Sequence, residues 1–256
     1  MAERVIPPGV REKLGIGPGV TFVQAPHSPF CISIRKALEA GSAPFTLYNT
    51  GIGDREPVIE LTDGAYYAVP VLVDADRAPA VVVYESRDDG TEVARYADAK
   101  FGLGIFPDEH KGLNDLVVRY VESEIEDVAF RLDDAFLIRS MTDVVKRTLL
   151  LRHKERKFGK GCVDQWRAQA PQLMTKLVDV LEPLDRILAR KPFLLGGSPV
   201  FADYALYGVL GNLTYTGDNQ IPREVPNILR WHAQLEATKL GSARGRASAA
   251  SEALRN

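Results

Sequence analysis

Ser28 and Cys31 are the residues of this chain whose types and spacing best suit thiol chemistry. They lie in the stretch Ser-Pro-Phe-Cys, which follows the apolar run at 20–25. Serine is a favoured helix cap and Pro29 suits the first helical position, so this spacing predicts that a helix begins here. The first turn of a helix offers unpaired N–H groups and a partial positive charge. A thiolate held at this place is stabilised without a metal.

Two chemical interpretations of this motif stay open. Ser28 occupies the place of the first cysteine in a Cys-x-x-Cys redox pair, so its hydroxyl could donate to the sulfur of a bound thiol. Cys31 could itself act as a nucleophile with a lowered pKa, because it lies in the first turn of the expected helix. Each residue also has a structural alternative, Ser28 as a helix cap and Cys31 as a small apolar side chain packed with Ile34 and Leu38.

The composition excludes several classes of function. The chain has 256 residues, of which 32 are Lys or Arg and 34 are Asp or Glu. This balance argues against a nucleic-acid binder, which would be basic. With only Cys31 and Cys162, no disulfide framework is expected, and a reducing cytoplasmic location fits. The N-terminus lacks the apolar run of a signal peptide, and no segment reaches the roughly 18 apolar residues that a membrane span needs.

Short strand and helix signals alternate between residues 19 and 101 and predict a small α/β domain. The order of these elements is thioredoxin-like. Residues 1–18 are expected to form an N-terminal extension. The expected strands are Val20–Gln24, Pro44–Tyr48, Val71–Asp74 and Ala80–Tyr84, and the expected helices are Pro29–Ala40 and Gly90–Phe101.

Residues 109–238, after a linker at 102–108, show helical periodicity and predict an all-α helical bundle. The basic run at 152–160 is interpreted as a solvated helix end. The tail at 239–256 is rich in Ala, Ser, Gly and Arg and is expected to be disordered. The expected helices run from Lys111 past Phe136, from Val163 to Ala189, from Phe201 to Leu213 and from Pro226 to Ala237.

Three motifs, in this order, resemble the glutathione S-transferase family. They are Ser-Pro-Phe at 28–30, Val-Pro-Val-Leu at 69–72, and Phe-Leu-Leu-Gly at 193–196 with Ala-Asp-Tyr at 202–204. The chain is most similar to the classes that have a serine at the catalytic position. The resemblance implies a thioredoxin-like N-terminal domain, an all-α helical-bundle C-terminal domain, glutathione as co-substrate and a homodimer.

The resemblance also implies roles for individual residues. Ser28 would donate a hydrogen bond to the glutathione sulfur. The Val69–Pro70 peptide bond would be cis and would turn the Val69 N–H and C=O toward the cysteinyl backbone of glutathione. Ala68 departs from the pattern, because several serine-type relatives have a lysine there that contacts the glycyl carboxylate. A cation elsewhere, namely Arg55, Lys36 or Arg35, could take its place.

Two pairs of residues compete for the γ-glutamyl end of glutathione. Glu85 and Ser86 match the Glu/Gln-Ser letters that the family carries after the fourth strand. Counting back from Tyr96 instead places Asp89 and Gly90 at the binding position. Either pair supplies an acidic side chain for the ammonium group of the ligand.

The expected function is a glutathione-dependent transferase, in which the activated thiolate attacks a small hydrophobic electrophile in detoxification or in a catabolic pathway. No metal, nucleic acid or membrane is expected as a partner. One alternative is a thiol–disulfide oxidoreductase that uses Cys31. A second alternative is a non-enzymatic protein with this fold that binds a protein partner, which the departures at Ala68 and at 85–90 favour.

Overall fold

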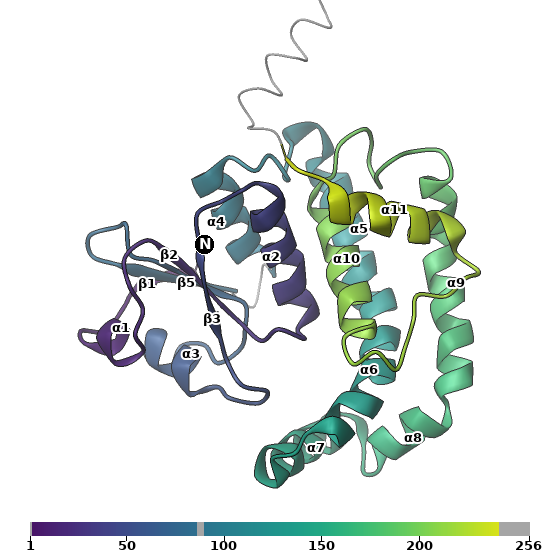
Figure 1. The fold of residues 1–256 in the computed structure, drawn as a ribbon, viewed down its shortest axis with the longest axis horizontal. Coiled ribbons are helices and arrows are strands. Elements are labelled where there is room, and N and C mark those ends of the chain that lie inside the picture. Colours follow the sequence, from purple (N-terminus) through teal and green to yellow (C-terminus); the bar gives the residue numbers. More distant parts are fainter. Residues whose placement is uncertain (1, 86–89, 241–256) are drawn as a thin grey trace, which may run out of the picture. The chain divides into compact units, whose positions relative to one another are not determined.

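The computed structural model describes residues 2–85 and 90–240, and the chain divides into two compact units. The first unit comprises residues up to Lys111 together with the segment from Thr238 onward, and the second runs from Gly112 to Ala237. All strands lie in the first unit, and the second is helical (Figure 1). A mixed α/β part followed by an all-α part confirms the fold that the sequence predicted.

A five-stranded mixed sheet with the strand order β1-β5-β4-β2-β3 forms the centre of the first unit. β2 and β3 are parallel, and the other neighbouring strands are antiparallel. Every residue of β2, β4 and β5 is buried, which explains their nearly continuous apolar sequences. The strands are β1 (Ala2–Val5), β2 (Val20–Gln24), β3 (Thr46–Asn49), β4 (Val71–Asp74) and β5 (Val81–Tyr84).

The sheet has one strand more than the sequence analysis expected. In β1, Ala2 lies opposite Tyr84 and Val5 lies opposite Val81 of β5. The sequence of β1, Ala-Glu-Arg-Val, is too short and too polar to predict a strand. Its pairing covers the edge of β5 that would otherwise expose a row of unpaired N–H and C=O groups. The N-terminal extension thus contributes an edge strand.

Four helices accompany the sheet: α1 (Val10–Lys13), α2 (Pro29–Ala40), α3 (Glu56–Leu61) and α4 (Glu92–Phe101). Helix α2 has the bounds that the sequence predicted, because its Ser-Pro start and its apolar stripe are strong local signals. Helices α2 and α4 contact each other, as do α1 and α3, and the sheet lies between the two pairs (Figure 1).

The second unit is built around α10 (Phe201–Leu213), in which nearly every residue is buried. Helix α6 (Glu126–Ser140) packs against it. A π-helical turn at Val121–Ile125 joins α6 to α5 (Lys111–Tyr120), so one helical run extends from Lys111 past Phe136 as expected. The remaining helices are α7 (Val144–Phe158), α8 (Cys162–Ala168), α9 (Ala170–Leu188) and α11 (Pro226–Ala237).

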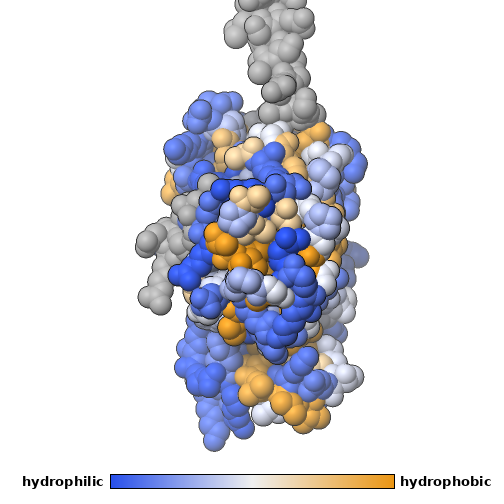
Figure 2. Space-filling model, turned by 90° about the vertical axis from the view of Figure 1, so that its left-hand side faces the viewer, coloured by the Kyte–Doolittle hydropathy of each residue, from blue (hydrophilic) through white to orange (hydrophobic). Residues whose placement is uncertain are grey.

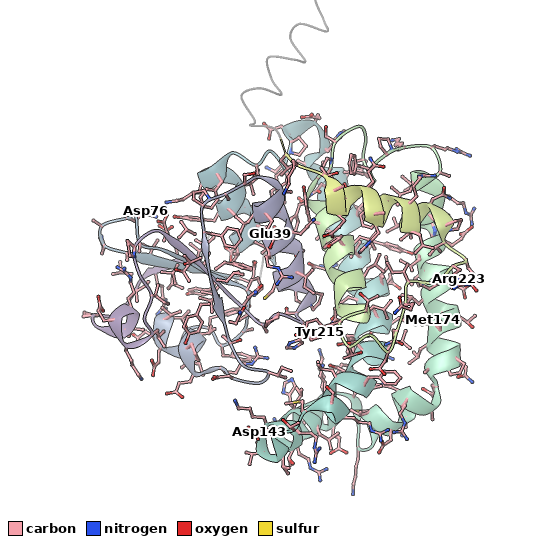
Figure 3. All side chains as sticks on the ribbon, in the orientation of Figure 1. Glu39, Asp76, Asp143, Met174, Tyr215 and Arg223 are labelled. Carbon is pink, nitrogen blue, oxygen red and sulfur yellow. The ribbon has the colours of Figure 1, made fainter. Side chains whose placement is uncertain are left out.

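Two helices of this unit differ from the expectation. The helix expected at Val163–Ala189 is broken into α8 and α9, because Pro171 has no N–H to donate to the carbonyl of Arg167. The sequence predicted only the end of helix α7, as the basic run at 152–160, because the helix buries no residue completely and its apolar periodicity is weak. It begins at Asp143, labelled in Figure 3, whose carboxylate accepts the N–H groups of Val145 and Lys146 at 3.0 Å each.

The tail expected to be disordered lies almost entirely outside the described residues. At its beginning, the Leu240 N–H donates to the Ala40 carbonyl at 2.7 Å. Among the described residues, no helix combines the length and the apolar character needed to cross a bilayer. Hydrophilic side chains cover most of the face shown in Figure 2 and separate its hydrophobic side chains into small patches.

Asp203, in the first turn of α10, connects three parts of the helical unit. Its carboxylate accepts the N–H of Leu194 at 3.0 Å, the N–H of Val200 at 3.0 Å and the indole N–H of Trp231 in α11 at 2.9 Å. The residue is 0% exposed, and burial raises its pKa to about 6 despite these donors. Val200 has no hydroxyl to cap the helix, so Asp203 supplies the polar contacts at this helix start.

We therefore expect Asp203→Ala to lower the free energy of unfolding of the helical unit by about 3–5 kcal/mol, because three buried donors would lose their acceptor. Urea unfolding followed by the fluorescence of Trp231 and Trp166 measures this change. Asp179→Ala, at an exposed position of α9, is the matched control and should change the free energy by less than ~0.5 kcal/mol. Equal effects of the two substitutions would contradict the central role of Asp203.

Candidate functional site

The register of the sheet brings three distant stretches of the sequence to one end. Val23 pairs with Val71, and Val71 pairs with Tyr84, so these residues form a row across β2, β4 and β5. Beyond this row, β2 continues into the turn that leads to α2, residues 69–70 precede β4, and Glu85 follows β5. The candidate residues from all three stretches therefore leave the sheet at the same end.

Ser28 is the N-cap residue of α2 and has extended backbone angles of φ −66° and ψ 127°. Its N–H donates to the Ala25 carbonyl at 2.9 Å, and its own carbonyl accepts from the N–H groups of Cys31 and Ile32 at 3.1 and 2.9 Å. The hydroxyl makes no capping hydrogen bond, so the prediction of a side-chain cap was wrong. The hydroxyl is thus held at the helix start without being used by the helix backbone.

Cys31 lies beside Ser28 and is completely buried. Burial is the main reason that the pKa of its thiol rises to about 11. Hydrogen bonds with the Ser28 side chain and the Ala25 backbone, and then the charges of Arg35 and Arg55, lower this pKa by smaller amounts. The structure therefore brings the two candidate catalytic residues together, but the Cys31 thiol stays protonated at neutral pH. The apolar packing interpretation fits this cysteine.

The Val69–Pro70 peptide bond is cis, which confirms the expectation from the resemblance. Val69 is only 9% exposed, yet among the described residues no hydrogen bond outside the strand ladders involves its backbone. Extending the pairing of β2 and β4 by two residues places Val69 opposite Ala25, near the start of α2. An unpaired peptide at a nearly buried position is uncommon and suits an incoming extended backbone.

Glu85 is the first residue after β5, and its carboxylate holds the start of α4. The carboxylate oxygens accept the N–H of Glu92 at 2.8 Å and the N–H of Val93 at 3.3 Å. A negative charge at this place also interacts favourably with the N-terminal end of the helix. Glu85 therefore has a structural role that the sequence analysis did not foresee.

Of the three other candidates for the γ-glutamyl contact, the structure describes only Gly90. Ser86 and Asp89 lie outside the described residues. Gly90 is exposed, and a Cβ added there would meet no atom within 4 Å. Tyr96, from which the alternative pair was counted, donates its hydroxyl to Asp74 in β4 at 2.6 Å. Its position in α4 is thus explained by a contact within the domain.

Tyr66 is a candidate that the sequence analysis missed. Its ring stacks on Tyr84, the last residue of β5, with the ring centroids 5.2 Å apart. The pKa of the phenol is raised to about 12, first by burial and then by the charges of Glu85 and Cys31, while the charge of Arg55 opposes the rise. The phenol therefore shares one environment with these three groups. The sequence signal that could have identified Tyr66 as a candidate is its position shortly before the Val-Pro motif at 69–70.

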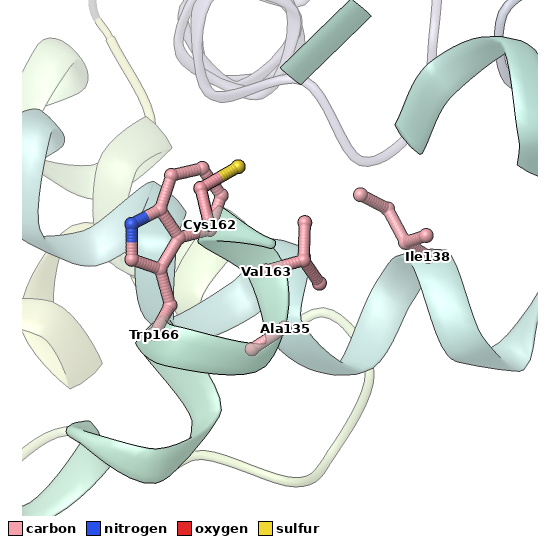
Figure 4. Close-up of a cluster of buried hydrophobic side chains, with 5 residues drawn as sticks. All are labelled: Ala135, Ile138, Cys162, Val163 and Trp166. Atoms are coloured by element: carbon pink, nitrogen blue, oxygen red, sulfur yellow. The ribbon is translucent and has the colours of Figure 1, made fainter. Parts of the chain in front are cut away.

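The second cysteine belongs to the hydrophobic core of the helical unit. Cys162 is 1% exposed and lies with Val163 and Trp166 of α8 against Ala135 and Ile138 of α6 (Figure 4). It therefore packs as a small apolar side chain. Within the described part of the chain, no group of three or more His, Cys, Asp or Glu residues is arranged to hold a metal ion.

Comparisons with known proteins connect this geometry to a family. Residues 164–234 match the family model of the glutathione S-transferase C-terminal domain. A search of curated proteins gave no match.

Several solved structures have a similar fold at low sequence identity. Glutaredoxin 2 from Salmonella typhimurium, crystallised with glutathione, is 21% identical with a TM-score of 0.64, covering 88% of this chain and 97% of that protein. A theta-class glutathione S-transferase from Xanthomonas axonopodis pv. citri, also with glutathione bound, is 18% identical with a TM-score of 0.59, covering 86% and 94%. A delta-class glutathione transferase from Nilaparvata lugens is 19% identical with a TM-score of 0.58, covering 87% and 90%. Residues 164–234 are therefore similar to the glutathione S-transferase C-terminal domain, and the chain has the glutathione S-transferase fold.

Proposed function

We propose that this protein is a glutathione transferase of the serine type, which activates the glutathione thiol for attack on a small hydrophobic electrophile. The observation that carries the proposal is the presence, at one end of the sheet, of a serine hydroxyl that does not cap its helix and of a backbone peptide suited to strand pairing. Ser28 has a hydroxyl that does not cap α2, and at the same end of the sheet Val69 has a backbone that makes no hydrogen bond outside the strand ladders among the residues that the structure describes. Structures of similar fold were crystallised with glutathione, which supports this choice of thiol.

Ser28 is proposed to stabilise the thiolate. A free thiol has a pKa of about 8.5, so little thiolate is present at neutral pH. A hydroxyl that donates to the sulfur, together with the first-turn N–H groups of α2, favours the anion and lowers that pKa. The thiol proton leaves to solvent, the sulfur forms a bond to the electrophilic carbon, and the leaving group departs with its electron pair. The contact with Cys31 does not prevent this role, because a hydroxyl can donate one hydrogen bond and accept two.

Val69 and Glu85 are proposed to fix the two ends of the ligand backbone. The Val69 N–H and C=O would pair with the cysteinyl residue of glutathione in the manner of an added strand. Glu85 would accept from the γ-glutamyl ammonium group, because a carboxylate is negatively charged and can accept several hydrogen bonds. Ser86 remains proposed as its neighbour in the ligand contact, and Asp89 with Gly90 as the alternative pair.

Arg55 is proposed as the cation that replaces the lysine missing at Ala68. Its side chain is exposed, and its charge acts on both Cys31 and Tyr66. Cys31 lies in the first turn of α2, where the glycyl carboxylate of glutathione would need a positive partner.

The oxidoreductase alternative has one observation in its favour, the similarity of the fold to a glutaredoxin. It requires a reactive Cys31 thiolate, whereas complete burial and a pKa of about 11 oppose this form. We therefore propose the transferase in preference to it. A homodimer in the cytoplasm remains part of the proposal, on the basis of the resemblance alone.

We expect Ser28→Ala to lower kcat/KM for glutathione and chlorodinitrobenzene by roughly ten- to a hundredfold, because a hydrogen bond to an anion is lost. Glutathione binding, measured by calorimetry, should persist, and the pKa of the bound thiol, read from its thiolate absorbance, should rise. Ser28→Thr keeps the hydroxyl and should retain activity. Ser33→Ala is the matched control on α2, since the Ser33 hydroxyl donates to the Phe30 carbonyl. An unchanged thiol pKa in Ser28→Ala would refute the proposed role.

We expect iodoacetamide to alkylate Cys31 in the folded protein only as the pH approaches 11. The thiolate is the reacting form, and the raised pKa keeps the thiol protonated below that value. In urea, alkylation of the same peptide should instead follow a pKa of about 8.5. Peptide mass mapping separates Cys31 from Cys162. Rapid alkylation of folded Cys31 at pH 7, or its mixed disulfide with glutathione, would favour the oxidoreductase.

A further inference from the structure

Helix α7 and the residues just after it gather positive charge that the proposed glutathione chemistry does not use. Residues 144–160 contain seven Lys or Arg and one acidic residue, Glu155, whereas the two kinds are nearly balanced over the whole chain. The helix packs against α6 and α8 (Figure 1) and buries none of its residues completely. Most of these cations are therefore exposed at the surface.

Contacts within the protein compensate only part of this charge. Lys154 forms an ion pair with Asp134 of α6 at 2.5 Å, so it serves the packing of α7 on the helical unit. Arg152 pairs with Glu155 one turn further along α7. Arg152 is exposed, and an ion pair at an exposed position holds its side chain only weakly. Arg152 is therefore available to a partner outside the chain.

Lys146 and Arg156 have no such partner among the residues that the structure describes. Both are exposed, and the side chain of neither forms an ion pair or a hydrogen bond there. Arg156 lies in the last turn of α7, where a cation interacts favourably with the helix end. Lys146 lies in the first turn, where the same interaction is unfavourable. The helix dipole therefore explains Arg156 but not Lys146.

Three aliphatic side chains are exposed on the same helix. Val144, Val145 and Leu149 are 60, 68 and 65% exposed. Val145 and Leu149 are four residues apart. Arg152 and Arg156 continue this helical spacing, so the four side chains form one stripe along α7. This α7 stripe is apolar in its N-terminal half and cationic in its C-terminal half.

We infer that the α7 stripe binds the surface of an anionic lipid membrane. Negative headgroups would lie against Arg152 and Arg156 in the stripe and against Lys146 beside it. Val145 and Leu149 would reach the boundary between the headgroups and the acyl chains, as in helices that lie in a membrane interface.

The aliphatic side chains favour a lipid surface over a nucleic acid. Phosphate groups of a nucleic acid would attract the cations but would give the exposed aliphatic side chains no apolar environment. The inference is independent of the proposed function, because it involves no residue of the candidate site. It also differs from the sequence interpretation of residues 152–160 as a solvated helix end.

Co-sedimentation of the full chain with lipid vesicles tests the inference. We expect binding to vesicles of phosphatidylcholine that contain roughly one-third phosphatidylserine, and little binding to phosphatidylcholine alone. Salt at about 1 M should release the protein, because it screens charges beyond ~3 Å. Equal binding to both kinds of vesicle would overturn the role of the cations, and no binding to either would overturn the inference as a whole.

A charge variant locates the membrane contact. Lys146→Gln with Arg156→Gln should weaken binding to the anionic vesicles by roughly thirtyfold. Lys176→Gln with Arg190→Gln removes two exposed cations of α9 and is the matched control, which should bind as the unaltered protein does. Urea unfolding checks that each variant is folded. Equal losses in the two variants would mean that overall charge, and not the α7 stripe, governs binding.

An apolar variant separates lipid from nucleic acid. Val145→Gln with Leu149→Gln keeps every charge and should weaken vesicle binding by roughly tenfold, because less apolar area leaves water. Leu116→Gln is the matched control, since Leu116 of α5 is as exposed as Leu149. Vesicle binding that this variant leaves unchanged, together with duplex DNA binding that only the charge variant weakens, would assign the α7 stripe to nucleic acid and refute the lipid inference.

Discussion

The pairing register of β2, β4 and β5 is the constraint on which the candidate site depends. A shift of one residue in either pair would turn the buried side chains of a strand to the other face. It would also separate the turn before α2 from Val69 and Glu85. Because all three strands are completely buried, the hydrophobic effect selects one register strongly. The geometry around Ser28 is therefore fixed by the core of the sheet.

Much of the fold could be predicted from local signals. The Ser-Pro start of α2 and the apolar stripe of α10 gave the observed bounds, and four strands were placed to within about two residues. Elements whose stability comes from tertiary contacts were missed. β1 exists because the edge of β5 needs a partner, and α7 buries no residue completely. Helices α8 and α9 are separate because Pro171 has no backbone N–H to donate.

The candidate site was predicted less completely, because motifs identify residues but not their environments. Ser28 and Cys31 are both candidates for thiol chemistry in the sequence, and burial distinguishes them. A hydroxyl keeps its hydrogen-bonding capacity when buried, whereas burial disfavours the reactive anionic form of a thiol. The helix-holding contacts of Glu85 and the stacking of Tyr66 on Tyr84 depend on which strands are neighbours. No local pattern contains that information.

The edge strand β1 has a practical consequence for handling the protein. Since Ala2 lies opposite Tyr84, a purification tag joined ahead of it would leave the sheet at the end where Tyr66, Glu85 and Val69 are found. Such a peptide would lie next to the candidate site. A protease that removes the tag and also trims a few residues of β1 would uncover the hydrogen-bonding groups of β5. Recombinant forms that differ only in their first residues can therefore differ in activity and in their tendency to aggregate.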